Sequence, residues 1–122
     1  INNSLDDYIK LIGWKENPYP YINKCDLYVQ PSRIESYGIA IVEAQVLGKV
    51  VVSTNTIGAK EVIENGKNGI ITNINASSIS EKIKDILTDI NTYELIETNV
   101  INMNFEDINN SALNKLYNII TN

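Results

Sequence analysis

PSRIESYGIAIVEA, residues 31–44, is the stretch that decides the fold. Residues 27–30 before it, LYVQ, predict a buried strand, which the proline ends. A polar turn holding Glu35 follows, and residues 38–47 predict a helix that carries Glu43. Both glutamates therefore reach the space outside the carboxyl end of a strand, where open α/β sheets bind ligands. Two carboxylates beside a helix start suit sugar hydroxyls, a ribose and a phosphate, so the stretch indicates a sugar-nucleotide site.

Outward from this stretch, strand patterns alternate with helix patterns. Further strands are expected at residues 8–13, 50–54 and 70–72, and helical segments at residues 21–24, 59–64, 78–90 and 105–119. Gly48 should end the helix of residues 38–47 as its C′ glycine, and Ser78 with Glu81 reads as a capping box. The alternation predicts an α/β fold, a partial Rossmann-like domain with a parallel sheet and flanking helices.

Composition excludes several classes of function. The chain of 122 residues carries a formal net charge of −5, and its pI is about 4.6, which argues against a nucleic-acid module. It contains no histidine, so His-based triads and His metal sites are excluded within it. No carboxylate cluster has metal-ligand spacing, and neither a metal nor a cofactor is expected.

The place of action is also constrained. Cys25 is the only cysteine, which rules out an internal disulfide and fits a reducing, cytoplasmic setting. No apolar run approaches the ~18–20 residues of a membrane span. The chain begins without a methionine and enters a strand-like pattern almost at once, so we expect a piece of a longer protein.

Five ordered motifs carry a family resemblance. They are PS at 31–32, the E-x7-E pair that ends in Glu43-Ala44, GKVVV at 48–52, GAKE at 58–61 and NGKNG at 65–69. In this order the chain resembles the C-terminal, donor-binding domain of retaining glycosyltransferases with the GT-B fold, the group 1 (family 4) set. The resemblance covers roughly residues 9–90, and residues 17–21 are similar to bacterial polysaccharide enzymes. Ser36, Val50 and Ile57 depart from the pattern, since Gly, Pro and Gly are common there.

The resemblance implies a role for each site residue. Glu35, the catalytic candidate, would contact hydroxyls of the donor sugar, and Glu43 would bind the ribose. The backbone amides that would contact the sugar and the diphosphate belong to Ser36, Tyr37, Gly38 and Ile39. Gly13 and Trp14 would lie near the base. From the residues alone, Glu43 could instead be a solvent-facing polar position, and Trp14 could cover the edge of the sheet.

The resemblance also implies partners. The whole of residues 1–122 would be the nucleotide-sugar-binding domain, and an acceptor domain would precede it in the full enzyme. The donor would be a nucleotide-diphosphate sugar, a UDP-sugar first, and the acceptor a glycan or lipid-linked glycan held by that other domain. The enzyme would be cytoplasmic or peripheral at the inner membrane face, and this chain alone inactive. Two alternatives remain: a non-catalytic nucleotide-sugar-binding or assembly module and, less favoured, a flavodoxin-like signalling domain.

Overall fold

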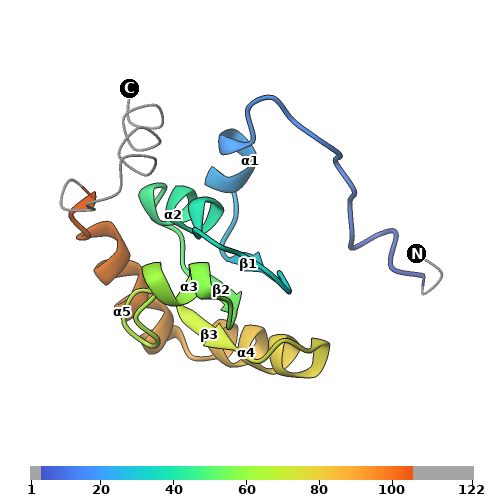
Figure 1. Ribbon diagram of the computed structural model, residues 1–122. Coiled ribbons are helices and arrows are strands. Elements are labelled where there is room, and N and C mark those ends of the chain that lie inside the picture. The colour runs from blue at the N-terminus through green and yellow to red at the C-terminus, as the bar shows by residue number, and fades with distance from the viewer. Residues whose placement is uncertain (1–3, 106–122) are drawn as a thin grey trace.

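The computed structural model describes residues 4–105 and contains a three-stranded parallel sheet (Figure 1). The strands are β1 (Tyr28–Gln30), β2 (Val51–Thr54) and β3 (Ile70–Thr72), in that order across the sheet. β2 is central and pairs Val51 with Tyr28 on one side and Val52 with Ile70 on the other. The expected parallel sheet of an α/β fold is confirmed.

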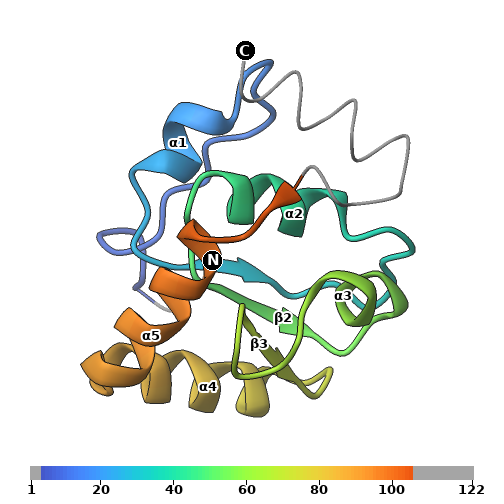
Figure 2. The same cartoon turned by 90° about the vertical axis from the view of Figure 1, so that its left-hand side faces the viewer.

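Helices cover both faces of this sheet, as Figures 1 and 2 show. They are α1 (Tyr19–Asn23), α2 (Ile39–Val46), α3 (Ile57–Val62), α4 (Ala76–Thr88) and α5 (Ile90–Ile101). Val51 packs with Ile41 of α2 and Ala59 of α3, whereas Val50 and Val52 pack with residues of α4 and α5. All three valines are fully buried, which explains the unbroken apolar run of a strand covered on both faces.

Side-chain caps explain where three helices begin. Thr56 accepts a hydrogen bond from the N–H of Ala59 and starts α3 at Ile57, two residues before the expected start. Asn75 accepts from the N–H of Ser78 at 2.7 Å and starts α4. The capping box that we expected at Ser78 is therefore wrong, because Ser78 already lies inside the first turn and Asn75 is the N-cap.

The helix expected at residues 78–90 is α4, which begins two residues earlier and ends at Thr88. Asp89 ends α4 and caps α5 by accepting from the N–H and the hydroxyl of Thr92. We did not predict α5, which buries Ile96 and Val100 against the sheet. The amphipathic helix expected from residue 105 lies almost wholly outside the described residues. Phe105 itself is buried beside Val42 of α2.

The strand expected at residues 8–13 is not formed. Tyr8 and Leu11 are 86% and 82% exposed, and this segment runs away from the sheet in Figure 1. A strand is stable only when its backbone groups pair with a neighbour, and no strand within the described residues pairs with this one. Within residues 4–105, no helix has the length and apolar character needed to cross a membrane.

Candidate functional site

The loop between β1 and α2 is held in place by the end of β2. The Thr54 hydroxyl donates to the backbone carbonyl of Ser32 and lies 3.2 Å from that of Gln30. The side-chain amide of Gln30 also donates a hydrogen bond to the Ser32 hydroxyl at 2.7 Å. The first part of the loop that carries Glu35 is thus attached to two strands at the carboxyl end of the sheet.

Two glycines lock the second part of the same loop onto α3. Gly38 has φ +66°, a left-handed conformation in which residues with a Cβ are strained, and it starts α2. The N–H of Gly58 donates to the carbonyl of Glu35 at 2.7 Å. A Cβ on Gly58 would lie 2.5 Å from the nitrogen of Gly38 and 2.9 Å from the Glu35 oxygen. Only glycine at position 58 allows this close contact between the two backbones.

The start of α2 differs chemically from the starts of the three helices that follow. Thr56, Asn75 and Asp89 cap α3, α4 and α5 with side-chain oxygens. α2 begins at Gly38 with no side-chain cap among the described residues. The first N–H groups of a helix have no partner within the helix, and the helix dipole makes that end positive. These amides suit an anion.

Glu43 is half-buried as the fifth residue of α2, and it contacts α1. Its Oε1 accepts a hydrogen bond from the Tyr19 hydroxyl at 3.4 Å. Burial raises the pKa of Glu43 above its ordinary value, and the Tyr19 hydrogen bond partly offsets this. Burial and the Glu43 charge likewise raise the pKa of Tyr19. Glu43 is therefore not the solvent-facing polar position that the residues alone left open.

Tyr28 on β1 connects the two glutamates electrostatically. Burial is the main cause that raises the pKa of Tyr28, and the charges of Glu43 and Glu35 raise it further. The Tyr28 hydroxyl donates to the Gln30 side chain at 2.9 Å.

The other expected site residues divide into two groups. Ser36 and Tyr37 are exposed on the loop, and Ile39 is half-buried at the start of α2. Gly13 and Trp14 lie on the N-terminal segment: Trp14 is 86% exposed, and the Cβ position of Gly13 has no described heavy atom within 4 Å. The structure therefore does not bring them to the glutamates, and Trp14 does not cover the sheet edge.

Sequence reasoning missed Tyr19, Tyr28 and Gln30 as neighbours of the site. Tyr19 is 24 residues from its partner Glu43, and no local pattern signals such a contact. Tyr28 and Gln30 share a face of β1 because side chains alternate along a strand, a signal that was available. Among residues 4–105, no group of three or more Cys, Asp or Glu residues could hold a metal ion.

Comparisons with known proteins identify the family of the chain. The family model described as "Glycosyl transferases group 1" matches residues 2–103. The chain is 33% identical over 101 residues to an uncharacterized glycosyltransferase of Methanocaldococcus jannaschii, covering 80% of this chain and 28% of that protein. It is 32% identical over 92 residues to the capsular polysaccharide biosynthesis glycosyltransferase CapM of Staphylococcus aureus, covering 75% and 24%.

A solved structure is similar along nearly the whole chain. The crystal structure of Anabaena Alr3699/HepE in complex with UDP-glucose matches with a TM-score of 0.78 and 27% identity, over 96% of this chain and 32% of that one. The chain thus spans about a quarter to a third of the length of these relatives. With a matching family model over residues 2–103 and a shared fold, the chain belongs to the group 1 glycosyl transferases, which are of the GT-B type.

Proposed function

We propose that residues 1–122 form the C-terminal, donor-binding domain of a retaining glycosyltransferase of family 4. The enzyme transfers a hexose-type sugar from a nucleotide diphosphate to an acceptor. UDP is the proposed nucleotide, because similar solved structures contain UDP or UDP-glucose. The acceptor, a glycan or lipid-linked glycan, is held chiefly by a domain outside this chain. This chain alone is expected to be inactive.

The observation that carries the proposal is the uncapped start of α2 between two carboxylates. Glu35 precedes this start on a loop fixed by Gly58, and Glu43 follows it on the helix itself. An anion at the helix start would satisfy the free amides, while the carboxylates accept hydrogen bonds from hydroxyls on either side. A nucleotide-diphosphate sugar has this order of groups: sugar, diphosphate, ribose.

Each residue then has a chemical role. Glu35 orients the donor sugar through its hydroxyls, and the amides of Ser36, Tyr37, Gly38 and Ile39 contact the sugar and the diphosphate. Because the departing diphosphate gains negative charge as the glycosidic bond breaks, N–H groups fixed beside it stabilise the transition state more than the ground state. No covalent intermediate on Glu35 is proposed, in keeping with same-face transfer and retention of configuration.

Glu43 binds the ribose hydroxyls, and Tyr19 holds the carboxylate that does so. A carboxylate already partly removed from water binds hydroxyl groups more strongly than one that is fully solvated. The base contact assigned to Gly13 and Trp14 rests on the family resemblance, and it requires the exposed N-terminal segment to lie against the nucleotide. The likeness to CapM supports a place in the synthesis of a cell-surface polysaccharide or glycoconjugate. A cytoplasmic location is part of the proposal and rests on the family resemblance.

A binding titration tests the donor site. The chain is titrated with UDP, GDP, UDP-glucose and UDP-galactose, as wild type, Glu43→Ala and the charge-matched control Glu94→Ala, whose side chain is exposed on α5. We expect UDP to bind, and Glu43→Ala to weaken it about 10-fold through loss of a charged hydrogen bond, while Glu94→Ala has no effect. Equal affinity of all three proteins would remove Glu43 from the site.

A kinetic measurement tests the reaction itself. In the full-length enzyme, Glu35→Gln should lower kcat, because Glu35 orients the reacting sugar. Unchanged turnover would remove Glu35 from the catalytic role. Sugar transfer at a normal rate by the 122-residue chain alone would contradict the proposed acceptor domain.

A further inference from the structure

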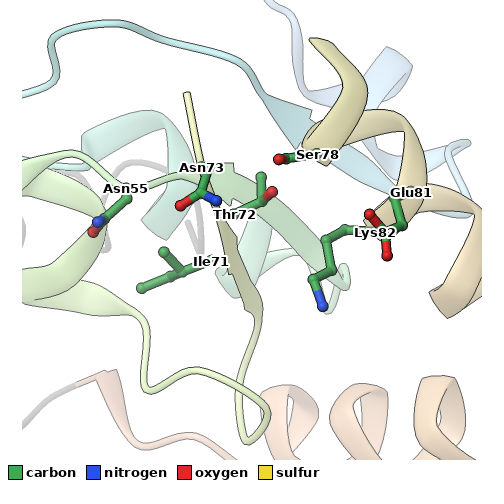
Figure 3. Close-up of a pocket in the computed structure, with 7 residues that line it drawn as sticks. All are labelled: Asn55, Ile71, Thr72, Asn73, Ser78, Glu81 and Lys82. Carbon is green, nitrogen blue, oxygen red and sulfur yellow. The ribbon is translucent and has the colours of Figure 1, made fainter. Parts of the chain in front are cut away.

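A polar pocket lies at the same carboxyl edge of the sheet, beside β3. Its volume is about 260 Å³, and it opens between the ends of β2 and β3 and the first turns of α4 (Figure 3). Asn55 follows β2, Thr72 ends β3 and Asn73 comes directly after it. Neighbouring strands are about 4.8 Å apart, so β3 lies on the order of 10 Å from β1, which leads to Glu35.

Thr72 is the unusual member of this pocket. Its side chain is only 5% exposed, and its Oγ1 has no hydrogen-bond partner among the described residues. In Figure 3 this hydroxyl points toward the side of the pocket on which Ser78 and Lys82 lie. A buried hydroxyl left without a partner is unfavourable, because it has given up its hydrogen bonds to water. A ligand that reaches this hydroxyl would restore a hydrogen bond.

The chemistry of the pocket favours an uncharged ligand rich in hydroxyl groups. Ser78, Glu81 and Lys82 stand at positions i, i+3 and i+4 and so lie on one side of α4. The charges of Glu81 and Lys82 are opposite and sum to zero. Asn75 already caps the helix start beside them, so those amides are not all free for a phosphate. Amide, hydroxyl, carboxylate and ammonium groups together can both donate to and accept from sugar hydroxyls.

The size of the pocket limits the ligand to one ring. Pockets for drug-sized ligands measure about 300–1,000 Å³, and this one is smaller. We propose that it is a subsite for one uncharged sugar ring of the acceptor glycan, an assignment that rests on the proposed function for its acceptor role. The N–H of Asn55 donates to the carbonyl of Thr72 at 2.9 Å, which joins the pocket to the segment leading to Gly58 and the donor loop.

An NMR titration of the chain tests the ligand class. Methyl α-glucoside, methyl α-galactoside, N-acetylgalactosamine, inorganic phosphate and UDP are added separately while backbone amide resonances are followed. At least one sugar should shift the amides of Asn55, Asn73 and Ser78 saturably, with a Kd of about 1 mM. Phosphate should not, and UDP should instead shift Gly38 and Ile39. Absence of saturable sugar shifts, or saturation by phosphate in their place, would overturn the proposal.

Thr72→Val tests the role of the buried hydroxyl with little change of shape. We expect sugar affinity to fall about 10-fold, because the variant removes the protein hydroxyl that pairs with a hydroxyl of the sugar. UDP affinity should be unchanged, and Tm should not fall, since the variant removes an unpaired buried polar group. Thr88→Val is the matched control, because Thr88 lies on α4 away from the pocket. Equal sugar affinity of Thr72→Val and wild type would overturn the role of Thr72.

The two proposals can fail separately. Loss of sugar shifts with UDP binding intact overturns only the subsite. Sugar binding without binding of any nucleotide contradicts the donor site and removes the acceptor role with it, while the sugar pocket stands. In the full-length enzyme, Thr72→Val should raise KM for the acceptor about 10-fold and leave KM for the nucleotide sugar unchanged. A change confined to the KM of the nucleotide sugar would overturn the acceptor assignment.

Discussion

Gly58→Ala should damage both the fold and the donor loop, because the added methyl group meets only backbone. Its carbon would lie 2.5 Å from the nitrogen of Gly38, 2.8 Å from that of Tyr37 and 2.9 Å from the oxygen of Glu35. No flexible side chain stands between them, so the loop must move away from α3. The hydrogen bond from the Gly58 N–H to the Glu35 carbonyl, 2.7 Å long, would stretch or break.

The expected change in the free energy of unfolding combines three effects. Overpacking against backbone costs about 1–3 kcal/mol, and the lost hydrogen bond about 1 kcal/mol. Alanine favours the helical conformation of α3 over glycine by about 1 kcal/mol, which offsets part of this. The net loss is therefore about 1–3 kcal/mol. A central value of about 2 kcal/mol lowers Tm by about 6–12 °C for a domain of this size.

Gly69→Ala is the matched control for this measurement. The added methyl group there would meet the side chain of Ile63 at 3.2 Å, and a side chain can shift where backbone cannot. Thermal and urea unfolding of both variants should show the larger loss for Gly58→Ala, and UDP titration should show weaker binding for that variant alone. If Gly58→Ala were as stable as wild type and bound UDP equally well, the backbone contact between the Glu35 loop and α3 would be refuted.

Four further outcomes are expected. Asn75→Ala should lower the free energy of unfolding by about 1 kcal/mol through loss of the α4 cap, whereas Ser78→Ala should change it by less than about 0.5 kcal/mol; the reverse order in urea unfolding would restore the capping box at Ser78. Ile41→Ala should cost about 2–5 kcal/mol in the same assay, because Ile41 is fully buried between α2 and the sheet. Trp14→Ala should leave Tm of the chain unchanged, since the indole is exposed; a large fall would place it in the core. Burial raises the pKa of Glu43 in the folded state, so the folded chain binds this proton at a higher pH than the unfolded chain does. The penalty for burying the charged carboxylate is therefore present above the folded pKa, and it is relieved as the pH falls toward the ordinary value. Glu43→Gln lacks the charge, so its stability advantage over wild type should be lost in that window.

Much of the fold could be predicted because it depends on local patterns. The continuous valines of β2, the glycine that ends α2 and the proline after β1 each act on their own neighbours, and their consequences appear where they were expected. The missed elements depend on competition between neighbours. Asn75 and Ser78 are both residue types that can cap a helix, and the folded chain uses Asn75. Asp89 ends α4 and also caps α5.

The sequence by itself determined the parallel α/β architecture and the two glutamates that follow the first strand, because strand periodicity, turn residues and motif spacing are properties of short segments. Only the tertiary structure decided how the Glu35 loop is held and what surrounds Glu43. The contact of Gly58 with Gly38 and the hydrogen bond of Tyr19 to Glu43 join residues 20 and 24 positions apart. The unpaired hydroxyl of Thr72 likewise depends on how α4 packs beside β3. Such contacts arise when separate elements pack together, and no local pattern specifies which side chains then meet.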